Sequence, residues 1–121
     1  MYFCCMENEV NESFEILLAA CQTADSNLAV AYKQLRDLLE RLCRAQMQDE
    51  SLQMTDLSAR ISFVSARAGL TIVEQNRLHT FRLTSNAILN RKEEPVREKL
   101  LRDAKTLAFF IRKLYAVEIP G

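Results

Sequence analysis

Hydrophobic residues recur every three or four positions along most of this 121-residue chain, which is the spacing of one buried face of an α-helix. The stripes predict five helices, three long and two short, over about residues 7–22, 28–47, 57–68, 72–90 and 95–117. Helices joined by short connections favour an all-α fold, an up-and-down bundle in a single domain spanning residues 1–121. Residues 1–6 are expected to fray, and residues 118–121 to form a tail or the start of a linker.

Polar and conformationally special residues stand where these helices should begin and end. A side-chain oxygen at a helix start accepts a free backbone N–H, and glycine tolerates the left-handed conformation that ends many helices. A capping box pairs two side chains with two such N–H groups, and proline suits a first helical position. The expected signals are, in chain order, Asp25 or Ser26, Thr55 or Asp56, Gly69, the capping box of residues 71–74, and Pro95.

The composition supports a helical protein and leaves little room for cofactor chemistry. Hydrophobic residues make up 49% of the chain and charged residues 26%, with two glycines and two prolines, which disfavours disorder and turn-rich all-β folds. The four cysteines lack paired zinc spacing and there is one histidine, so neither a metal nor a cofactor is expected. MYFCCM has no basic region or long apolar run, so we expect no signal peptide, no membrane span and a cytoplasmic location.

Charge is balanced over the chain but unevenly distributed along it. Residues 1–27 contain five acids and no Lys or Arg, whereas residues 57–92 contain six basic residues and the single acid Glu74. Two interpretations stay open: the six form a basic surface that binds nucleic acid, or they only solvate outer helix faces. The six are Arg60, Arg67, Arg77, Arg82, Arg91 and Lys92.

One line of the fourth predicted helix carries polar side chains, namely His79, Arg82, Asn86 and Asn90. Because residues three or four apart share a helix face, the arginine and the two asparagines could hold a phosphate or a carboxylate. They include no general base. The alternative is that Arg82 pairs with an acid of a neighbouring helix while both asparagines close the helix end. No Gly-rich phosphate loop, nucleophile elbow or zinc-binding helix occurs in the sequence.

Two short patterns lie within residues 10–117. An L-R-x-x-L-E pattern consists of Leu35, Arg36, Leu39 and Glu40. A series of leucine-histidine, arginine and asparagine consists of Leu78, His79, Arg82 and Asn86. In their order and spacing these patterns resemble the all-helical HEPN-type domain of unknown function that is found at the N-termini of type I restriction motor subunits and related bacterial helicases. Asn90 stands where the family usually has a histidine.

This resemblance implies a HEPN-like bundle that associates about a two-fold axis. In active HEPN ribonucleases both subunits contribute the arginine and the histidine to one cleft that positions RNA. Asn90 cannot take up a proton near neutral pH as an imidazole can, which argues against ribonuclease activity. We therefore expect a non-catalytic interaction or accessory module of a bacterial nucleic-acid-processing or defence system. The alternatives are a HEPN-type ribonuclease or toxin, and salt-dependent nucleic-acid binding through residues 60–92.

Candidate binding and interface residues follow from these patterns. The binding candidates are Arg36, Glu40, Arg77, His79, Arg82, Asn86, Asn90, Arg91 and Lys92. The interface candidates are Phe109, Phe110 and Tyr115, which lie close together on the fifth predicted helix; burial within the protomer is the alternative for the last two. The expected partner is a second copy or another protein, with RNA or DNA as further possibilities.

Overall fold

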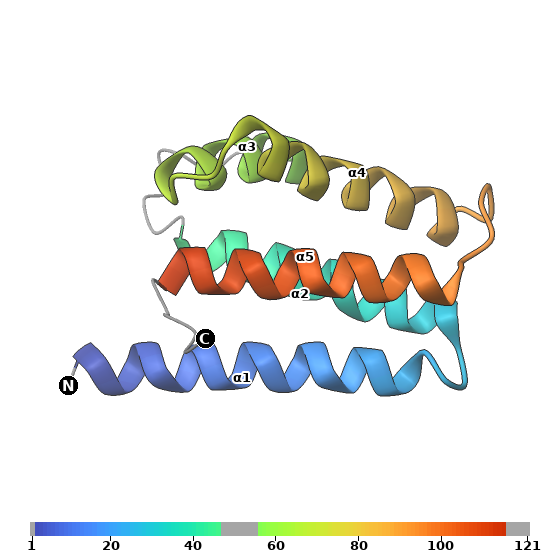
Figure 1. The fold of residues 1–121 in the computed structure, drawn as a ribbon, viewed down its shortest axis with the longest axis horizontal. Coiled ribbons are helices and arrows are strands. Elements are labelled where there is room, and N and C mark those ends of the chain that lie inside the picture. The colour runs from blue at the N-terminus through green and yellow to red at the C-terminus, as the bar shows by residue number, and fades with distance from the viewer. Residues whose placement is uncertain (1, 47–55, 116–121) are drawn as a thin grey trace.

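The computed structural model contains five α-helices and, within residues 2–46 and 56–115 that it describes, no strand (Figure 1). Side chains are described from residue 8 onward. The predicted all-α fold is confirmed. The helices are α1 (Tyr2–Thr23), α2 (Leu28–Gln46), α3 (Leu57–Arg67), α4 (Ile72–Leu89) and α5 (Arg97–Tyr115).

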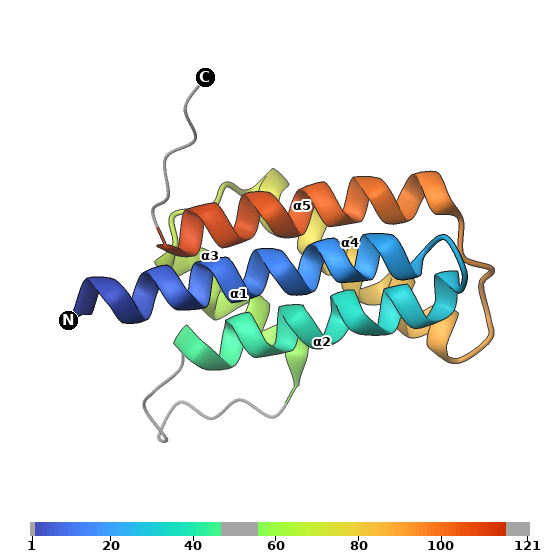
Figure 2. The same ribbon diagram turned by 90° about the horizontal axis from the view of Figure 1, so that it is seen from below.

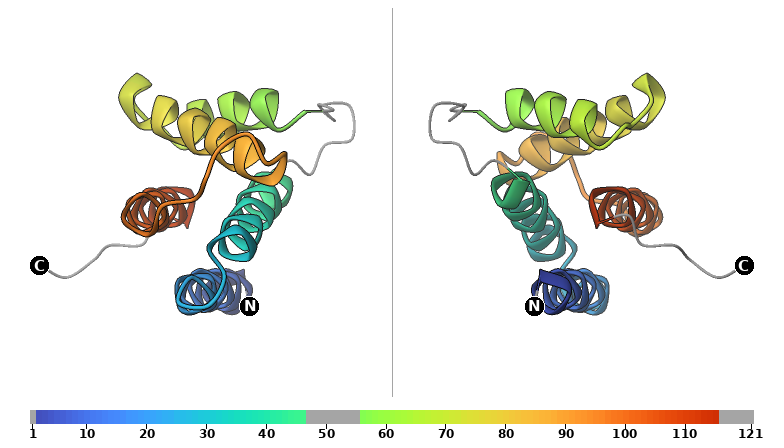
Figure 3. Two further views of the ribbon diagram at one scale, coloured as in Figure 1. Left: turned by 90° about the vertical axis from the view of Figure 1, so that its right-hand side faces the viewer. Right: turned by 90° about the vertical axis from the view of Figure 1, so that its left-hand side faces the viewer.

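The helices form three layers, which the end-on views show most clearly (Figure 3). α3 and α4 form the upper layer of Figure 1, and α2 and α5 form the middle layer. α1 packs on the opposite side against both middle helices (Figures 1 and 3). α1, α2, α4 and α5 alternate in direction, as in an up-and-down bundle. These four have 18 to 22 residues and only α3, with 11, is short, so the expected division into three long and two short helices was wrong.

α2 is the central helix, because it packs against each of the other four. Its apolar stripe is buried on several sides, and Tyr32 at its start stacks on Phe81 of α4 with 6.2 Å between ring centroids. Seen from below, α1 lies between α2 and α5, and it packs against both (Figure 2). A helix in that position removes apolar surface of both middle helices from water, which is the main favourable contribution to folding.

Three of the predicted helix ends are confirmed. Asp56 Oδ1 accepts the backbone N–H of Ala59 at 2.7 Å and so caps α3. Gly69 follows the end of α3 with a φ of 75°, the left-handed conformation that glycine tolerates. At the start of α4, Thr71 and Glu74 form the capping box, with donor–acceptor distances of 2.8 and 3.2 Å. The other predicted cap, Thr55, lies outside the described residues.

The predicted cap of α2 was wrong by one or two positions. Asn27, not Asp25 or Ser26, accepts the N–H of Val30 through its side chain, at 3.2 Å. Asp25 instead forms an ion pair with Arg97 at the start of α5. Asn, Asp and Ser are all good N-caps, so residue type alone could not choose among three consecutive candidates.

Two further expectations concern the starts of α1 and α5. α1 begins at Tyr2. Pro95 does not occupy the first position of α5: the carbonyl of Val96 accepts the N–H of Leu100 at 3.0 Å, which places Val96 at the cap and Pro95 before it. The expected tail at residues 118–121 lies outside the described part of the chain.

Candidate functional site

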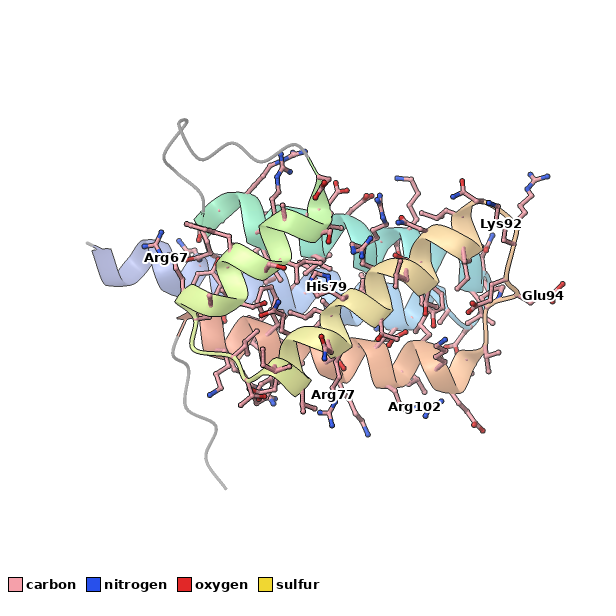
Figure 4. The ribbon with its side chains drawn as sticks, turned by 90° about the horizontal axis from the view of Figure 1, so that it is seen from above. Arg67, Arg77, His79, Lys92, Glu94 and Arg102 are labelled. Carbon is pink, nitrogen blue, oxygen red and sulfur yellow. The ribbon has the colours of Figure 1, made fainter. Side chains whose placement is uncertain are left out.

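The polar line of α4 begins beside α3. His79 points toward α3 from the middle of the upper layer (Figure 4), and its Nε2 lies 3.1 Å from Ser62 Oγ. Gln75 Nε2, one turn earlier on α4, donates to the same hydroxyl at 3.3 Å. His79 therefore links two helices through Nε2, while its Nδ1 is shielded from solvent and has no partner among the described residues.

The surroundings of His79 favour a neutral imidazole. Burial lowers its pKa below the ordinary value of 6.5, and the positive charge of Arg82 lowers it further. Arg82 itself is half-buried, and its Nε is shielded from solvent without an acceptor among the described residues. The acidic partner on a neighbouring helix that we considered for Arg82 is absent from the described ion pairs.

The two residues of the pattern on α2 interact with each other. Arg36 Nη1 lies 3.2 Å from Glu40 Oε1, and both side chains are partly exposed. An ion pair between residues four apart on one helix contributes only a few tenths of a kcal/mol, roughly 0.3–0.5 kcal/mol. The pair holds the guanidinium and the carboxylate along α2, but Arg36 Nε is shielded from solvent and has no acceptor among the described residues.

The far end of the polar line closes α4 through its backbone. The N–H of Asn90 donates to the carbonyl of Asn86 at 3.0 Å, and the N–H of Lys92 donates to that of Ala87 at 2.8 Å. Between them Arg91 has a φ of 58°, so a left-handed residue ends the helix as glycine usually does. The described hydrogen bonds include none from the Asn86 or Asn90 side chains. In the alternative considered for the two asparagines their side chains close this end, but the backbone closes it instead.

The basic residues of segment 60–92 do not gather at one place. In Figure 4 Arg67 lies at one end of the upper layer, Lys92 at the other end, and Arg77 on the long edge next to α5. The Arg67 guanidinium covers the ring of Phe63, 5.9 Å from its centroid. The acidic first helix is on the opposite side of the molecule from α4, so it does not cover these residues.

Arg77 instead lines a groove between α4 and α5 together with cationic side chains of α5. Figure 4 shows Arg77 and Arg102 projecting from the two helices at the same edge. The groove has a volume of about 770 Å³. Its cationic lining consists of Arg77, Lys99, Arg102 and Lys105, and its apolar lining includes Leu70, Val73, Leu78, Phe109 and Phe110. We refer to this space and its fourteen lining residues, which also include Glu74, Asn76, Thr80, Asp103 and Thr106, as the α4–α5 groove.

The three aromatic interface candidates are divided by burial. Phe109 is 38% exposed and lies in the α4–α5 groove, with Lys113 Nζ 5.6 Å from its ring centroid. Phe110 is 1% exposed, and Tyr115 is buried with its hydroxyl donating to Glu9 at 3.1 Å. Phe110 and Tyr115 are thus core residues, and their prediction as interface residues is corrected: on a helix, neighbours in sequence point in different directions.

A buried polar contact supports the floor of the groove. The hydroxyl of Tyr32 on α2 donates to Asp103 Oδ2 on α5 at 3.1 Å. Burial is the main cause that raises the pKa of both groups, and their mutual hydrogen bond raises that of Tyr32 further. Sequence analysis did not find this pair, nor Lys99, Arg102 and Lys105. The regular spacing of the three cations by three residues was the available signal for them.

The cysteines behave as packing residues where they are described. Cys43 is buried, and burial raises the pKa of its thiol to about 12; burial also raises the pKa of Cys21. The side chains of Cys4 and Cys5 lie outside the described residues. Within the described part, no three His, Cys, Asp or Glu side chains cluster as a metal site would require.

Comparison of the chain with protein-family models, curated proteins and solved structures finds no match. The HEPN resemblance therefore stays a prediction from sequence. No helix in the described residues is long and apolar enough to cross a membrane. Function has to be inferred from the side chains that the fold brings together.

Proposed function

We propose that the protein is a non-catalytic helical interaction module of a bacterial nucleic-acid-processing or defence system, which self-associates and binds partner chains. The observation that carries this proposal is the α4–α5 groove, where an exposed phenylalanine and cations from two helices surround an apolar floor. Apolar surface that a protomer leaves uncovered, with a charged rim, is typical of protein-binding surfaces.

The polar line of α4 supports binding better than catalysis. General base catalysis needs a group that can take a proton from the reacting atom within hydrogen-bond distance. His79 Nε2 is engaged by Ser62, and the Asn90 side chain is an amide that does not titrate. Arg82 can bind an anion but cannot act as a base at physiological pH.

A HEPN-type ribonuclease is the second candidate, because Arg82 is incompletely satisfied within the protomer. Its Nε is a charged donor, shielded from solvent and without an acceptor among the described residues. A phosphate could bind the partly exposed guanidinium through its Nη groups. In this alternative two copies bring their Arg82 side chains to one cleft, and RNA occupies the cleft between them.

The experiment that tests the proposal joins a mass measurement to a cleavage assay. Light scattering of the purified chain at low and high salt, with and without a short RNA, is expected to give the mass of a dimer under every condition. Incubation with RNA and a chelator is expected to leave the RNA intact. RNA cleavage that disappears in Arg82→Ala would overturn the non-catalytic proposal, and a monomer at high protein concentration would overturn self-association.

A further inference from the structure

Two helices of the protomer present parallel stripes to an unfilled groove. The α4 lining includes Val73, Arg77 and Thr80, which are four and three residues apart, beside Glu74, Asn76 and Leu78. On α5 it is lined at matching intervals by Lys99, Arg102, Asp103, Thr106, Phe109 and Phe110. Residues at these spacings lie along one side of a helix, so the groove runs lengthwise between α4 and α5.

The floor of the groove is mainly apolar. Val73 is 61% exposed and Phe109 is 38% exposed, and Leu78 and Phe110 are fully buried. Covering exposed apolar side chains stabilises a complex by about 25 cal/mol for each Å² of apolar surface removed from water. A ligand for this groove therefore needs an apolar side of its own.

Cations at the rim are available to an outside ligand. Arg77, Arg102 and Lys105 form no ion pair within 4.0 Å in the described part of the chain, and Lys99 lies 3.5 Å from Glu93. The two acids of the groove are already engaged, since Glu74 belongs to the capping box of α4 and Asp103 accepts from Tyr32. The ligand should therefore carry acidic groups at the edge of its apolar side.

The molecule already contains a helix bound in this way. α1 packs against both α2 and α5 with Val10, Leu17 and Ala20 buried and Leu18 exposed, and residues 1–27 contain no Lys or Arg (Figure 2). At its edge Glu12 Oε2 lies 2.9 Å from Arg41 Nη2, and Glu9 accepts from Tyr115. An acidic helix of this chain thus covers one side of α5, whereas no helix within the described residues covers the α4–α5 groove.

We propose that the α4–α5 groove binds an acidic amphipathic helix of a partner protein. Apolar residues of that helix, spaced by three and four, pack on Val73 and Phe109, and its carboxylates meet Arg77, Arg102 and Lys105. Helix-in-groove recognition of this kind is a recurrent mode of peptide binding. The inference rests on the proposed role as an interaction module and names the partner class.

Nucleic acid fits the same groove less well. Its binding relies on phosphate contacts and on bases stacked against aromatic rings. The described groove exposes one aromatic side chain, Phe109, and otherwise aliphatic ones, and the carboxylate of Asp103 would repel a phosphate at the floor. A helix with carboxylates only at its edges avoids that repulsion.

Selection from a phage-displayed library tests the proposal directly. One library encodes helices with Leu, Ile or Phe at three-four spacing and Glu or Asp at the flanks, and a second encodes the same residues in shuffled order. Enriched peptides are synthesised with a fluorescent label, and their binding to the full chain is measured by fluorescence anisotropy. Labelled oligo(U) and oligo(dT) are measured in parallel at low and high salt.

Variants then locate the bound peptide. Arg77→Glu combined with Arg102→Glu is expected to weaken binding about tenfold or more, because two favourable charge contacts become repulsive. Arg91→Glu combined with Lys92→Glu reverses as much charge outside the α4–α5 groove and is expected to change affinity less than threefold, about 0.6 kcal/mol at most. Phe109→Ser should abolish measurable binding, and circular dichroism verifies that each variant remains helical.

Each outcome decides the inference. Enrichment of the amphipathic library over the shuffled one, with binding lost in the groove variants, supports it. Absence of enrichment, peptides that ignore the groove variants, or oligonucleotides that bind more tightly than any peptide and depend on Arg77 and Arg102 would overturn it. If light scattering gives a dimer but the selection enriches no peptide, the inference about the groove is wrong and the proposed self-association stands. If light scattering gives a monomer that binds enriched peptides, only the proposed self-association is wrong.

Discussion

Replacing Arg91 by glycine should stabilise the protein. Arg91 is the one non-glycine residue with a positive φ in the described part of the chain, at 58°, and it ends α4 where Gly69, with a φ of 75°, ends α3. The two turns share the same backbone hydrogen bonds: Leu70 N–H reaches the Ser65 carbonyl at 3.0 Å, as Lys92 reaches that of Ala87. The difference between them is the side chain at the left-handed position.

The magnitude follows from opposing effects on the folded and unfolded chain. A side chain with a Cβ costs roughly 1–2 kcal/mol in the left-handed conformation, which glycine avoids. Glycine also makes the unfolded chain more flexible, which takes back about 0.5–1 kcal/mol. The net gain for Arg91→Gly is about 0.5–1 kcal/mol, or a rise in Tm of about 2–5 °C for a chain of this size.

Urea denaturation followed by circular dichroism measures this gain, with Arg91→Ala as the control. Alanine removes the charge and the long side chain but keeps the Cβ, so its stability should stay near that of the wild type. Gly69→Ala should destabilise by about 1 kcal/mol, because it places a Cβ at the corresponding position of α3. The reasoning is refuted if Arg91→Gly is no more stable than Arg91→Ala.

Three further predictions concern the polar contacts of the upper and middle layers. Because burial and the charge of Arg82 lower the pKa of His79, the unfolded chain takes up a proton at this residue before the folded chain does as pH falls. The stability that neutral His79 contributes is therefore complete above pH 6.5 and declines below it. Urea midpoints measured above and below pH 6.5 should differ less in His79→Gln than in the wild type. Thr71→Ala should lower the free energy of unfolding by about 1 kcal/mol through loss of the capping box, while Thr71→Ser should retain it in thermal melts. Tyr32→Phe should destabilise by about 1–2 kcal/mol because the half-buried Asp103 carboxylate loses a donor, an effect that Asp103→Asn in the same background should relieve; equal stability of the single and double variants would contradict this.

Much of the fold could be predicted because periodicity and caps act locally. Apolar stripes gave the number of helices and the central position of α2, and residues 71–74 specified a capping box that needs no tertiary contact. The errors arose where several residues could serve equally or where tertiary contacts intervene. Asn27 caps α2, whereas Asp25 pairs with Arg97, which is 72 residues away in sequence.

The α4–α5 groove could not be predicted from local patterns, because two helices far apart in sequence build it. Arg77 was grouped with the basic residues nearest in sequence, yet it lies beside Arg102 (Figure 4). The exposure of Phe109 next to buried Phe110 depends on how α5 is rotated against α2 and α4. Rotation and neighbours are properties of the packed molecule, and sequence spacing constrains them only within one helix.

The polar line of α4 shows how far helical spacing can mislead about a site. Residues on one face are aligned, but each residue adds 1.5 Å along the axis, so His79 and Asn90 are separated by about 16 Å and Arg82 and Asn90 by about 12 Å. One phosphate cannot contact both ends of such a line. Any reaction at Arg82 would need a second group close to it, and Asn90 of the same protomer is too far away to provide one. If Arg82 and Asn90 act together in cleaving RNA, a second copy has to bring its Asn90 to Arg82, so a monomer would exclude that form of the ribonuclease alternative.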